Sequence, residues 1–518
     1  MLSKKDIKHL AKLARLSLSD KEIKTYTSQL QEVLKYIDQL GEVDTANTEP
    51  TYQVLDGTVN VLREDEIKPS LSQVDATSQS PSNHNGYFVV ENVFTNVRRS
   101  VVTTKPKKRK KIDKHNSVLT KVNPKGNIAH KDLFMTKGVE TTAGSNMLDG
   151  YRAHYSSSVV NLFERKGFKT KYKLNQDAWG HGASGENSDY GPTNNPWDKT
   201  KVAGGSSSGT GVVVATGDVD LATGTDTCGS IRMPASFCGV CGLKPTYGAL
   251  SRYGVIAFAS SLDCPSLMST SVRKLRKAFE AVSARDPSDA TSQSDGRKTT
   301  RKKALTIGLP KEFFGRGVDE GVKNKILEAV EVFKGLGLKT QKVSLPHSKF
   351  GVSAYYIIAP TETSSNLARY DGVRYGHGRE NFGSEAKRRI MLGTYVSSKG
   401  YSEKYYQKAA LVRTKIIQDF EEVFQNVDVL MGPVAPTPAF GIGEKVDDPL
   451  SMYLMDIFAA PASLSGIPSL ALPCGFSSKH LPIGFQLMGP RWSEPMLFDL
   501  GEKYQSKTKW HEKKPILR

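Results

Sequence analysis

Residues 204–232 read GGSSSGTGVVVATGDVDLATGTDTCGSIR and carry two glycine-flanked serines, Ser206 and Ser230, that stand 24 residues apart. The stretch contains no histidine, so a base other than imidazole must activate a serine hydroxyl. Upstream, Lys131 stands in IAHKDLFMTKG at the end of a short apolar run, which predicts a buried amine. Serine activated by lysine is a known variant of the serine-histidine-aspartate arrangement. These residues predict a serine hydrolase with a lysine base.

A lysine with its ordinary pKa of about 10.4 is protonated at neutral pH, so burial must lower the pKa of this base. Two alternatives concern the same stretch. Residues 205–209 also fit the pattern GxSxG, which would make Ser207 the nucleophile of an α/β-hydrolase, but NPWDKTKVAGG before it is not a strand pattern. A flexible linker is the other alternative, and the apolar VVVATG that follows argues against it.

The flanking sequence extends the pattern. With GASGENSDYGPTNNPWDKTKV before the serines and MPASFCGVCGLKPTYGALSRYGVIAFASSLD after them, the chain resembles the amidase signature family. The resemblance covers roughly residues 117–518 and is strongest to the A subunits of tRNA-dependent amidotransferases, which convert glutamyl-tRNA(Gln) to glutaminyl-tRNA(Gln). It implies an α/β fold whose mixed sheet is covered by helices on both sides.

The resemblance also implies catalytic roles. Ser230 would be the nucleophile, Lys131 the base, and Ser206, which follows a cis peptide bond in the family, the proton relay between them. An oxyanion hole is implied at the backbone N–H groups of Thr227, Cys228, Gly229 and Ser230.

Substrate binding is implied at two charged residues. Arg389 in KRRIMLGTY would pair with the α-carboxylate of glutamine, with Arg388 the less favoured register, and Asp456 in MYLMDIF would pair with its α-ammonium. No metal or cofactor is expected in this chain, because it contains no GxxxxGK[ST] motif and no paired metal-ligand pattern. Cys238 and Cys241 form an isolated CxxC, more consistent with small buried residues than with a zinc site.

The chain departs from the family pattern at several positions. Cys228 replaces a glycine, and we expect its side chain to restrict the turn and impair the oxyanion loop. KLNQDAWGHG at 173–182 replaces the more typical KLNMDEFAMG, and Ser208 and Thr210 stand where glycine and serine are usual. Of the long helical region that normally precedes the lysine, only HNSVLTKV at 115–122 is reminiscent.

Residues 1 to about 93 carry a second resemblance, to the small C subunit of the same amidotransferases, through LSKKDIKHLAKLARLSLSDKEI, VLREDEIKPSLS and NGYFVVENV. The predicted domains are therefore a C-subunit-like helical module and strap at 1–97, a basic linker at 98–116 and an amidase domain at 117–518.

Local patterns predict the elements. Ser3 and Ser19 are expected N-caps, and Ser19 with Glu22 forms a capping box before an amphipathic helix that ends at Gly41. Residues 42–72 lack periodicity and predict an extended strap, and 283–303 predict a surface loop. Strands are expected at 304–310, 427–433, 469–476 and 482–489.

Charge and composition limit the classes of protein to which the chain can belong. The 518 residues carry a net charge of +19, and nine Lys/Arg against one Asp lie between Arg98 and His115. This run fits a solvated tether, a contribution to tRNA affinity or, least well, a nuclear-localisation signal. The chain has no apolar run of 18 residues, so we expect no contact with a membrane. Its five cysteines are scattered and its N-terminus lacks a signal-peptide pattern, which favours a cytoplasmic protein.

The expected function is that of a glutaminase, which supplies ammonia to a separate B subunit that would bind the mischarged glutamyl-tRNA and use ATP and Mg²⁺. The alternatives are a stand-alone amide hydrolase and a non-catalytic assembly subunit. Aspartyl-tRNA(Asn) stays open as a second acceptor, because the partner selects the tRNA.

Overall fold

One large mixed sheet organises the protein. The computed structural model describes residues 2–55, 62, 65–67, 69–90, 110–293 and 305–516. Its main sheet has eleven strands in the order β10-β9-β11-β13-β12-β7-β8-β6-β4-β5-β3. The strands are β3 (Val118–Lys121), β4 (Ile128–Lys131), β5 (Thr170–Leu174), β6 (Leu221–Thr225), β7 (Cys241–Lys244), β8 (Pro265–Ser269), β9 (Thr306–Pro310), β10 (Lys339–Val343), β11 (Val429–Pro433), β12 (Ser469–Phe476) and β13 (Pro482–Met488).

Strand pairing is parallel within β10-β9-β11 and β6-β4-β5, and antiparallel elsewhere in the sheet. The predicted strands at 304–310, 427–433, 469–476 and 482–489 are confirmed as β9, β11, β12 and β13. Residues 115–122 contain the edge strand β3 and no helix, in keeping with the β-branched Val118 and Thr120.

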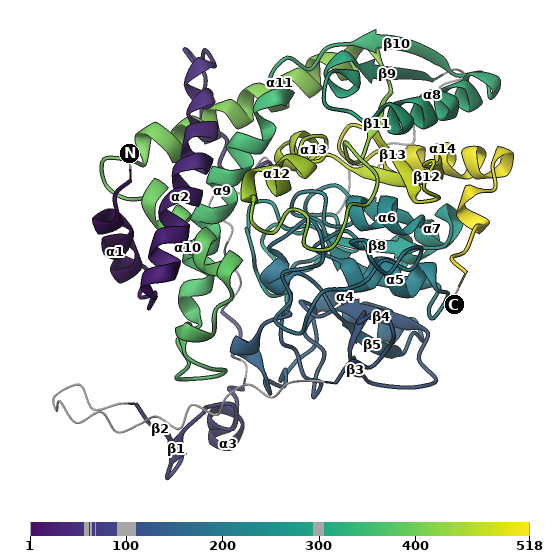
Figure 1. The fold of residues 1–518 in the computed structure, drawn as a ribbon. Helices are drawn as coiled ribbons and strands as arrows, with labels where there is room; N and C mark the ends of the chain where they lie inside the picture. Colours follow the sequence, from purple (N-terminus) through teal and green to yellow (C-terminus); the bar gives the residue numbers. More distant parts are fainter. Residues whose placement is uncertain are drawn as a thin grey trace.

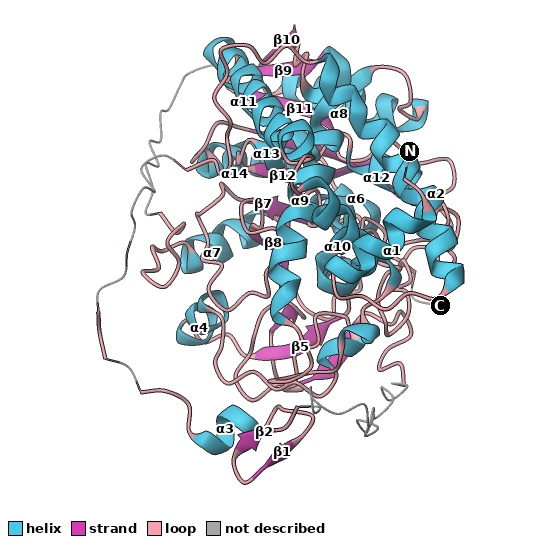
Figure 2. Ribbon diagram, turned by 90° about the vertical axis from the view of Figure 1, so that its left-hand side faces the viewer, coloured by secondary structure: helices cyan, strands magenta, loops and turns pink. Residues whose placement is uncertain are grey.

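Helices cover both sides of the sheet, so the expected α/β fold class is confirmed (Figures 1 and 2). The α-helices of the body are α4 (Ser158–Arg165), α5 (Ser208–Ala215), α6 (Arg232–Cys238), α7 (Val272–Val282), α8 (Glu320–Gly335), α9 (Gly351–Asn366), α10 (Ser384–Val396), α11 (Lys408–Asn426), α12 (Pro449–Tyr453), α13 (Ala460–Leu464) and α14 (Glu494–Lys507). Among the described residues, no helix has the length and apolar character needed to cross a membrane.

The N-terminal residues form the expected helical module. Helices α1 (Lys4–Leu13) and α2 (Asp20–Ile37) are N-capped by Ser3 and Ser19, each with a capping box, and a 3₁₀ turn over Asp38–Glu42 follows α2. Two amphipathic helices alone are too small to shield both of their apolar faces from water, so these faces must also pack against a larger partner. The buried face of α2 accordingly packs beside α9 and α10, where the hydroxyl of Tyr26 donates to the carbonyl of Ser384 (3.2 Å).

The strap continues along the body as far as residue 55 without helix or strand. The ring of Tyr52 stacks on Tyr406 at 5.8 Å, and its carbonyl accepts from Arg413. A short helix α3 (Gln73–Thr77) and a hairpin of β1 (Asn83–His84) and β2 (Tyr87–Phe88) follow near the lower end of the molecule (Figure 2). Of the predicted strap, residues 56–61, 63, 64 and 68 lie outside the described residues.

Two other predicted segments are described only in part. Residues 98–109 of the basic linker lie outside the described residues, as do residues 294–303 of the predicted loop at 283–303. Residues 283–293 of that loop contain no helix or strand.

The sheet explains why distant residues meet. Strands β4 and β6 are parallel neighbours, with Ile128 opposite Leu221. Lys131 is the last residue of β4 and Thr225 the last of β6. The carboxyl ends of parallel neighbours lie at the same edge, which brings Lys131 to the loop at 226–230.

Candidate active site

Lys131 lies fully buried at this edge, with 0% of its surface exposed. Its Nζ donates to Ser206 Oγ at 2.7 Å and to Thr225 Oγ1 at 2.8 Å. Burial lowers the pKa of Lys131 to about 7, although the carboxylates of Asp177, Asp226 and Asp263 favour the charged form. Near neutral pH a large fraction of this amine is therefore neutral and able to accept a proton.

Ser206 follows a cis peptide bond, as the resemblance implies. Its carbonyl accepts from the backbone N–H of Asp177 at 3.1 Å. The preceding Gly205 must lack a side chain, since a Cβ there would collide with Asp177 Oδ2 and with the backbone nitrogens of Ser184 and Gly185. The GG pair before the serines therefore lets the chain pass close to Asp177 and present Ser206 to Lys131.

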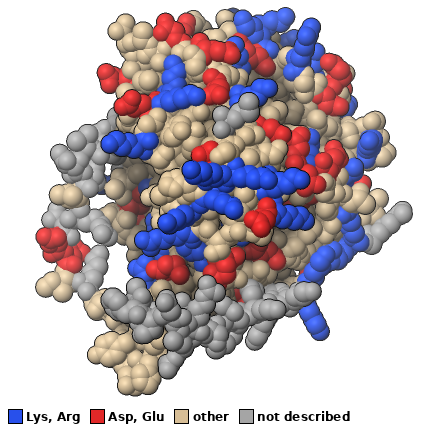
Figure 3. Space-filling view, turned by 60° about the vertical axis from the view of Figure 1, so that its left-hand side comes forward, with Lys and Arg blue, Asp and Glu red and all other residues tan. Residues whose placement is uncertain are grey.

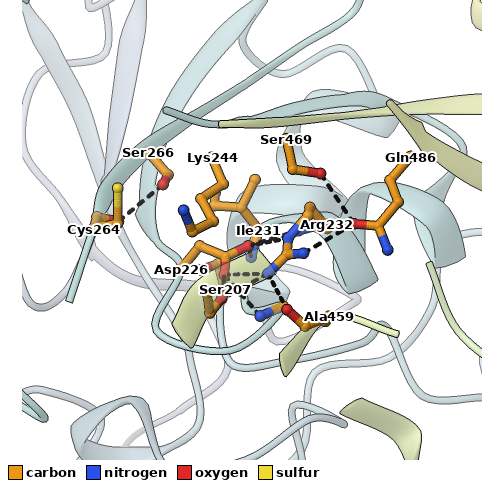
Figure 4. Close-up of polar contacts among 12 residues, drawn as sticks. Ser207, Asp226, Ile231, Arg232, Lys244, Cys264, Ser266, Ala459, Ser469 and Gln486 are labelled. Atoms are coloured by element: carbon orange, nitrogen blue, oxygen red, sulfur yellow. Dashed lines mark hydrogen bonds and ion pairs between the residues drawn. The ribbon is translucent and has the colours of Figure 1, made fainter. Parts of the chain in front are cut away.

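Ser230 ends a loop held by a buried carboxylate. Asp226 accepts from the backbone N–H groups of Gly229 (2.7 Å) and Ile231 (3.2 Å) and pairs with Arg232 through Nε and Nη2, both at 3.0 Å. Burial alone would raise the pKa of Asp226, but the guanidinium lowers it to about 2. Figure 4 shows Arg232 between Asp226 and Gln486.

Ser230 itself is 5% exposed, and its hydroxyl has no hydrogen-bond partner among the described residues. The backbone N–H groups of Thr227, Cys228 and Ser230 are likewise unpaired within the described part of the chain. Gly229 differs from the expectation because its N–H already donates to Asp226. Three of the four backbone N–H groups predicted as oxyanion donors are thus without a partner in the described structure, and their role stays a prediction.

The expectation that Cys228 strains the loop is wrong in its physical premise. Cys228 is not among the non-glycine residues with positive φ, whereas Gly229 has a φ of +86°. A Cβ at Gly229 would also lie 2.8 Å from that of Ala459. The turn requires glycine at position 229, and position 228 accepts a side chain at no backbone cost.

The two arginines of KRRIMLGTY share the carboxylate of Glu385 but differ in their other neighbours. Arg388 pairs with Glu385, and its Nε donates to Gln29 of the N-terminal module at 3.0 Å. Arg389 is 2% exposed and lies over the rings of Phe258, Tyr356 and Tyr453 at 5.0–5.5 Å, with its Nε on Glu385 at 2.7 Å. Its Nη1 is buried without a hydrogen-bond partner in the described structure.

Asp456 lies near the same cluster and beside the oxyanion loop. Its Oδ2 accepts from the hydroxyl of Tyr356 at 3.1 Å, and a Cβ at Gly229 would lie 3.3 Å from its Oδ1. Burial raises the pKa of Asp456 to about 8, and a bound ammonium would favour the ionised carboxylate. A guanidinium and a carboxylate thus lie near Tyr356, an arrangement suited to the two charges of an amino acid.

Sequence reasoning missed three residues that hold this site. Thr225 accepts from Lys131, Asp177 holds the chain around Gly205, and Tyr356 connects Arg389 with Asp456. Thr225 and Asp177 belong to motifs that the sequence displays, GTDT and KLNQD, so their neighbourhood could have been inferred. Tyr356 lies in α9 with no distinguishing local pattern.

The alternative sites receive no support from the geometry. The Ser207 hydroxyl donates to the backbone carbonyl of Thr225 at 3.2 Å, so it has a structural partner and no hydrogen bond to a base among the described residues. Cys238 and Cys241 are buried free thiols, contacting Ala203 and Gln505 respectively. No cluster of three or more His, Cys, Asp or Glu side chains that could hold a metal ion occurs among the described residues.

The sequence of this chain is similar to known amidases and amidotransferase subunits. The amidase family model matches residues 107–498, and the model for the Glu-tRNAGln amidotransferase C subunit matches residues 18–90. The A subunit of glutamyl-tRNA(Gln) amidotransferase from Lactococcus lactis is 46% identical over 411 residues, covering 75% of this chain and 84% of that protein. The protein of the same name from Gloeobacter violaceus is 47% identical over 411 residues, with the same coverages.

Solved structures with the same fold include one A subunit of this kind. The crystal structure of the A subunit of glutamyl-tRNA(Gln) amidotransferase from Thermotoga maritima superposes with a TM-score of 0.69 at 37% identity, covering 79% of this chain and 92% of that one. A 6-aminohexanoate cyclic dimer hydrolase shares the fold, with a TM-score of 0.70, 22% identity, and coverage of 76% of this chain and 86% of that one.

Proposed function

The chain belongs to the amidase family, and we propose that it is the glutaminase component of a glutamyl-tRNA(Gln) amidotransferase with its C subunit fused at the N-terminus. It hydrolyses the side-chain amide of glutamine and supplies ammonia for converting glutamyl-tRNA(Gln) to glutaminyl-tRNA(Gln). The observation that carries the chemistry is the hydrogen bond between buried Lys131 and Ser206 beside the loop that carries Ser230.

The proposed reaction is an acyl transfer through Ser230. Its Oγ attacks the amide carbon, and its proton passes to Ser206 while Ser206 gives its own proton to neutral Lys131. The backbone N–H groups of Thr227, Cys228 and Ser230 stabilise the developing oxyanion. The C–N bond then breaks as the same relay returns a proton to the leaving nitrogen, and ammonia departs. Water, deprotonated through Ser206 and Lys131, hydrolyses the ester to glutamate and frees Ser230.

The partner in this proposal is a B subunit that binds the mischarged tRNA and uses ATP and Mg²⁺. Those ligands therefore belong to the complex, and this chain contributes glutamine chemistry and assembly. Lys and Arg side chains gather across the middle of the face in Figure 3, and exposed lysines of α1 include Lys4, Lys5, Lys8 and Lys12. Such charge, with the net +19, favours approach of the tRNA phosphates. A cytoplasmic location and the domain division at 97 and 117 remain predictions.

The two alternatives are less well supported. A non-catalytic assembly protein would not need a buried lysine whose amine, among the described residues, hydrogen-bonds only to the hydroxyl groups of Ser206 and Thr225. A stand-alone hydrolase would not need the C-subunit-like module, whose helices α1 and α2 are seated on the body. The choice between glutamyl-tRNA(Gln) and aspartyl-tRNA(Asn) belongs to the partner.

Arg389→Met tests glutamine as the substrate. The variant removes the guanidinium near the amino-acid end and leaves the relay of Lys131, Ser206 and Ser230 in place. We expect KM for glutamine to rise at least about 100-fold, because a charge-assisted pair is worth roughly 3 kcal/mol, while kcat/KM for propionamide changes much less. Steady-state ammonia release measures both.

Arg388→Met is the control at the neighbouring position, since Arg388 shares Glu385 with Arg389 but donates to Gln29 of the N-terminal module. It should raise KM for glutamine far less than Arg389→Met does. Equal losses on glutamine and propionamide in Arg389→Met would show that Arg389 holds the fold and does not select the substrate.

A further inference from the structure

His181 is a buried histidine that the proposed reaction does not use. It is 0% exposed, and neither Nδ1 nor Nε2 has a hydrogen-bond partner in the described structure. Its backbone is fixed: the N–H donates to the carbonyl of Ala178 at 3.0 Å, and the carbonyl accepts from Asn187 at 3.1 Å. A buried polar ring with both nitrogens unpaired is uncommon. Among the described residues His115 is the other example, so the position of His181 must show what its ring binds.

The position of His181 points to the amino-acid end of the site. Its ring meets Phe258 edge to face, with centroids 4.6 Å apart, and the guanidinium of Arg389 lies 5.4 Å from the centre of the same Phe258 ring. A Cβ at the preceding Gly180 would lie 3.7 Å from Ser206 Oγ. His181 and Arg389 therefore contact the same Phe258 ring, and the residue before His181 lies beside Ser206.

Two buried donors without partners thus flank one aromatic ring: the Nη1 of Arg389 and a ring N–H of His181. We propose that His181 is a further specificity-determining residue, which donates a hydrogen bond to the α-carboxylate that Arg389 pairs with. This inference rests on the proposed function, because it assigns a second contact to the same substrate.

The ligand that fits both groups is an anion with at least two acceptor oxygens. Arg389 carries a permanent charge, which favours a carboxylate over a neutral amide. Burial, with the nearby Arg389, lowers the pKa of His181 well below its usual value, so the imidazole is neutral and presents one N–H. The substrate ammonium would then remain with Asp456, which accepts from the hydroxyl of Tyr356.

The test compares His181→Met with unaltered protein in steady-state hydrolysis of glutamine and of propionamide, which has no α-carboxylate. We expect KM for glutamine to rise about tenfold with kcat changed less than threefold, and the preference for glutamine over propionamide to fall by a similar factor. His181→Asn, which restores an N–H donor, should recover part of the loss. Thermal unfolding of each variant shows whether it is folded.

His115→Met is the matched control, because His115 is also buried with both ring nitrogens unpaired, but its charged neighbours, Asp113, Lys114, Lys199 and Asp218, are not residues of the proposed site. Its KM for glutamine should stay unchanged. Calorimetric titration of glutamine into Ser230→Ala and into the double variant of Ser230→Ala with His181→Met tests the role of His181 separately from the proposed glutaminase function. Equal affinity in both proteins would overturn the role of His181 and leave the proposed function standing. Failure of the unaltered protein to bind or hydrolyse glutamine would overturn the proposed function itself.

Discussion

Replacing Lys131 with methionine should reduce kcat for glutamine hydrolysis by about 10⁴- to 10⁶-fold, the range found when a member of a catalytic triad is removed. Methionine is unbranched like lysine and close to it in shape, but it lacks the amine that contacts Ser206 and Thr225. The fold should persist, because an apolar chain in a fully buried position avoids the desolvation cost of the amine. Ammonia release under saturating glutamine measures the effect.

The unaltered enzyme should show the matching pH dependence. Burial lowers the pKa of Lys131 to about 7, so the fraction of neutral amine, and with it kcat, should rise as pH increases through 7. The double variant of Lys131→Met with Ser230→Ala should be no slower than the slower single variant, since the residues act as one relay. A flat pH profile together with a loss below tenfold would contradict the assignment of Lys131 as base.

Replacing Asp226 with alanine should produce the largest loss of stability. The substitution leaves Arg232, which is 0% exposed, with a buried charge, and removes the acceptor for the N–H of Gly229. Breaking a buried pair by deleting one partner typically costs about 3–5 kcal/mol. The free energy of unfolding, measured with urea, should fall by that amount, and glutamine hydrolysis should be lost with the geometry of the loop.

Asp499→Ala is the matched control for this loss. Asp499 pairs with Arg276 at 2.5 Å, but its side chain is 61% exposed. Surface ion pairs contribute about 0–1 kcal/mol, so the free energy of unfolding should change little. Similar losses in the two variants would show that the Asp226–Arg232 pair does not hold the oxyanion loop.

Features determined by local chemistry could be predicted from the sequence. The N-cap at Ser3 and the capping box of Ser19 with Glu22 are set by nearby residues, and the strands β11, β12 and β13 by short apolar runs. The proximity of Lys131 and Ser206 was inferred through family resemblance, since residues 75 apart in the chain carry no local signal of contact.

Features determined by packing could not be predicted in the same way. Arg388 and Arg389 are adjacent in α10 but have different neighbours. Arg388 contacts the N-terminal module, whereas Arg389 lies over Phe258. The tolerance for Cys228 depends on which residue of the loop takes positive φ, and the local sequence alone did not assign it to Gly229. The strand at 118–121 depends on pairing with β5, which no local pattern specifies.

The most direct measurement follows the side-chain nitrogen of glutamine. The unaltered chain and its Ser230→Ala variant are each combined with a B subunit, glutamyl-tRNA(Gln), ATP, Mg²⁺ and glutamine carrying heavy nitrogen in its amide. We expect mass spectrometry to find the heavy nitrogen in glutaminyl-tRNA(Gln) with the unaltered chain and none with Ser230→Ala, while free ammonium restores product in the variant. Equal transfer of the label by both proteins would contradict the central claim that Ser230 of this chain releases the ammonia.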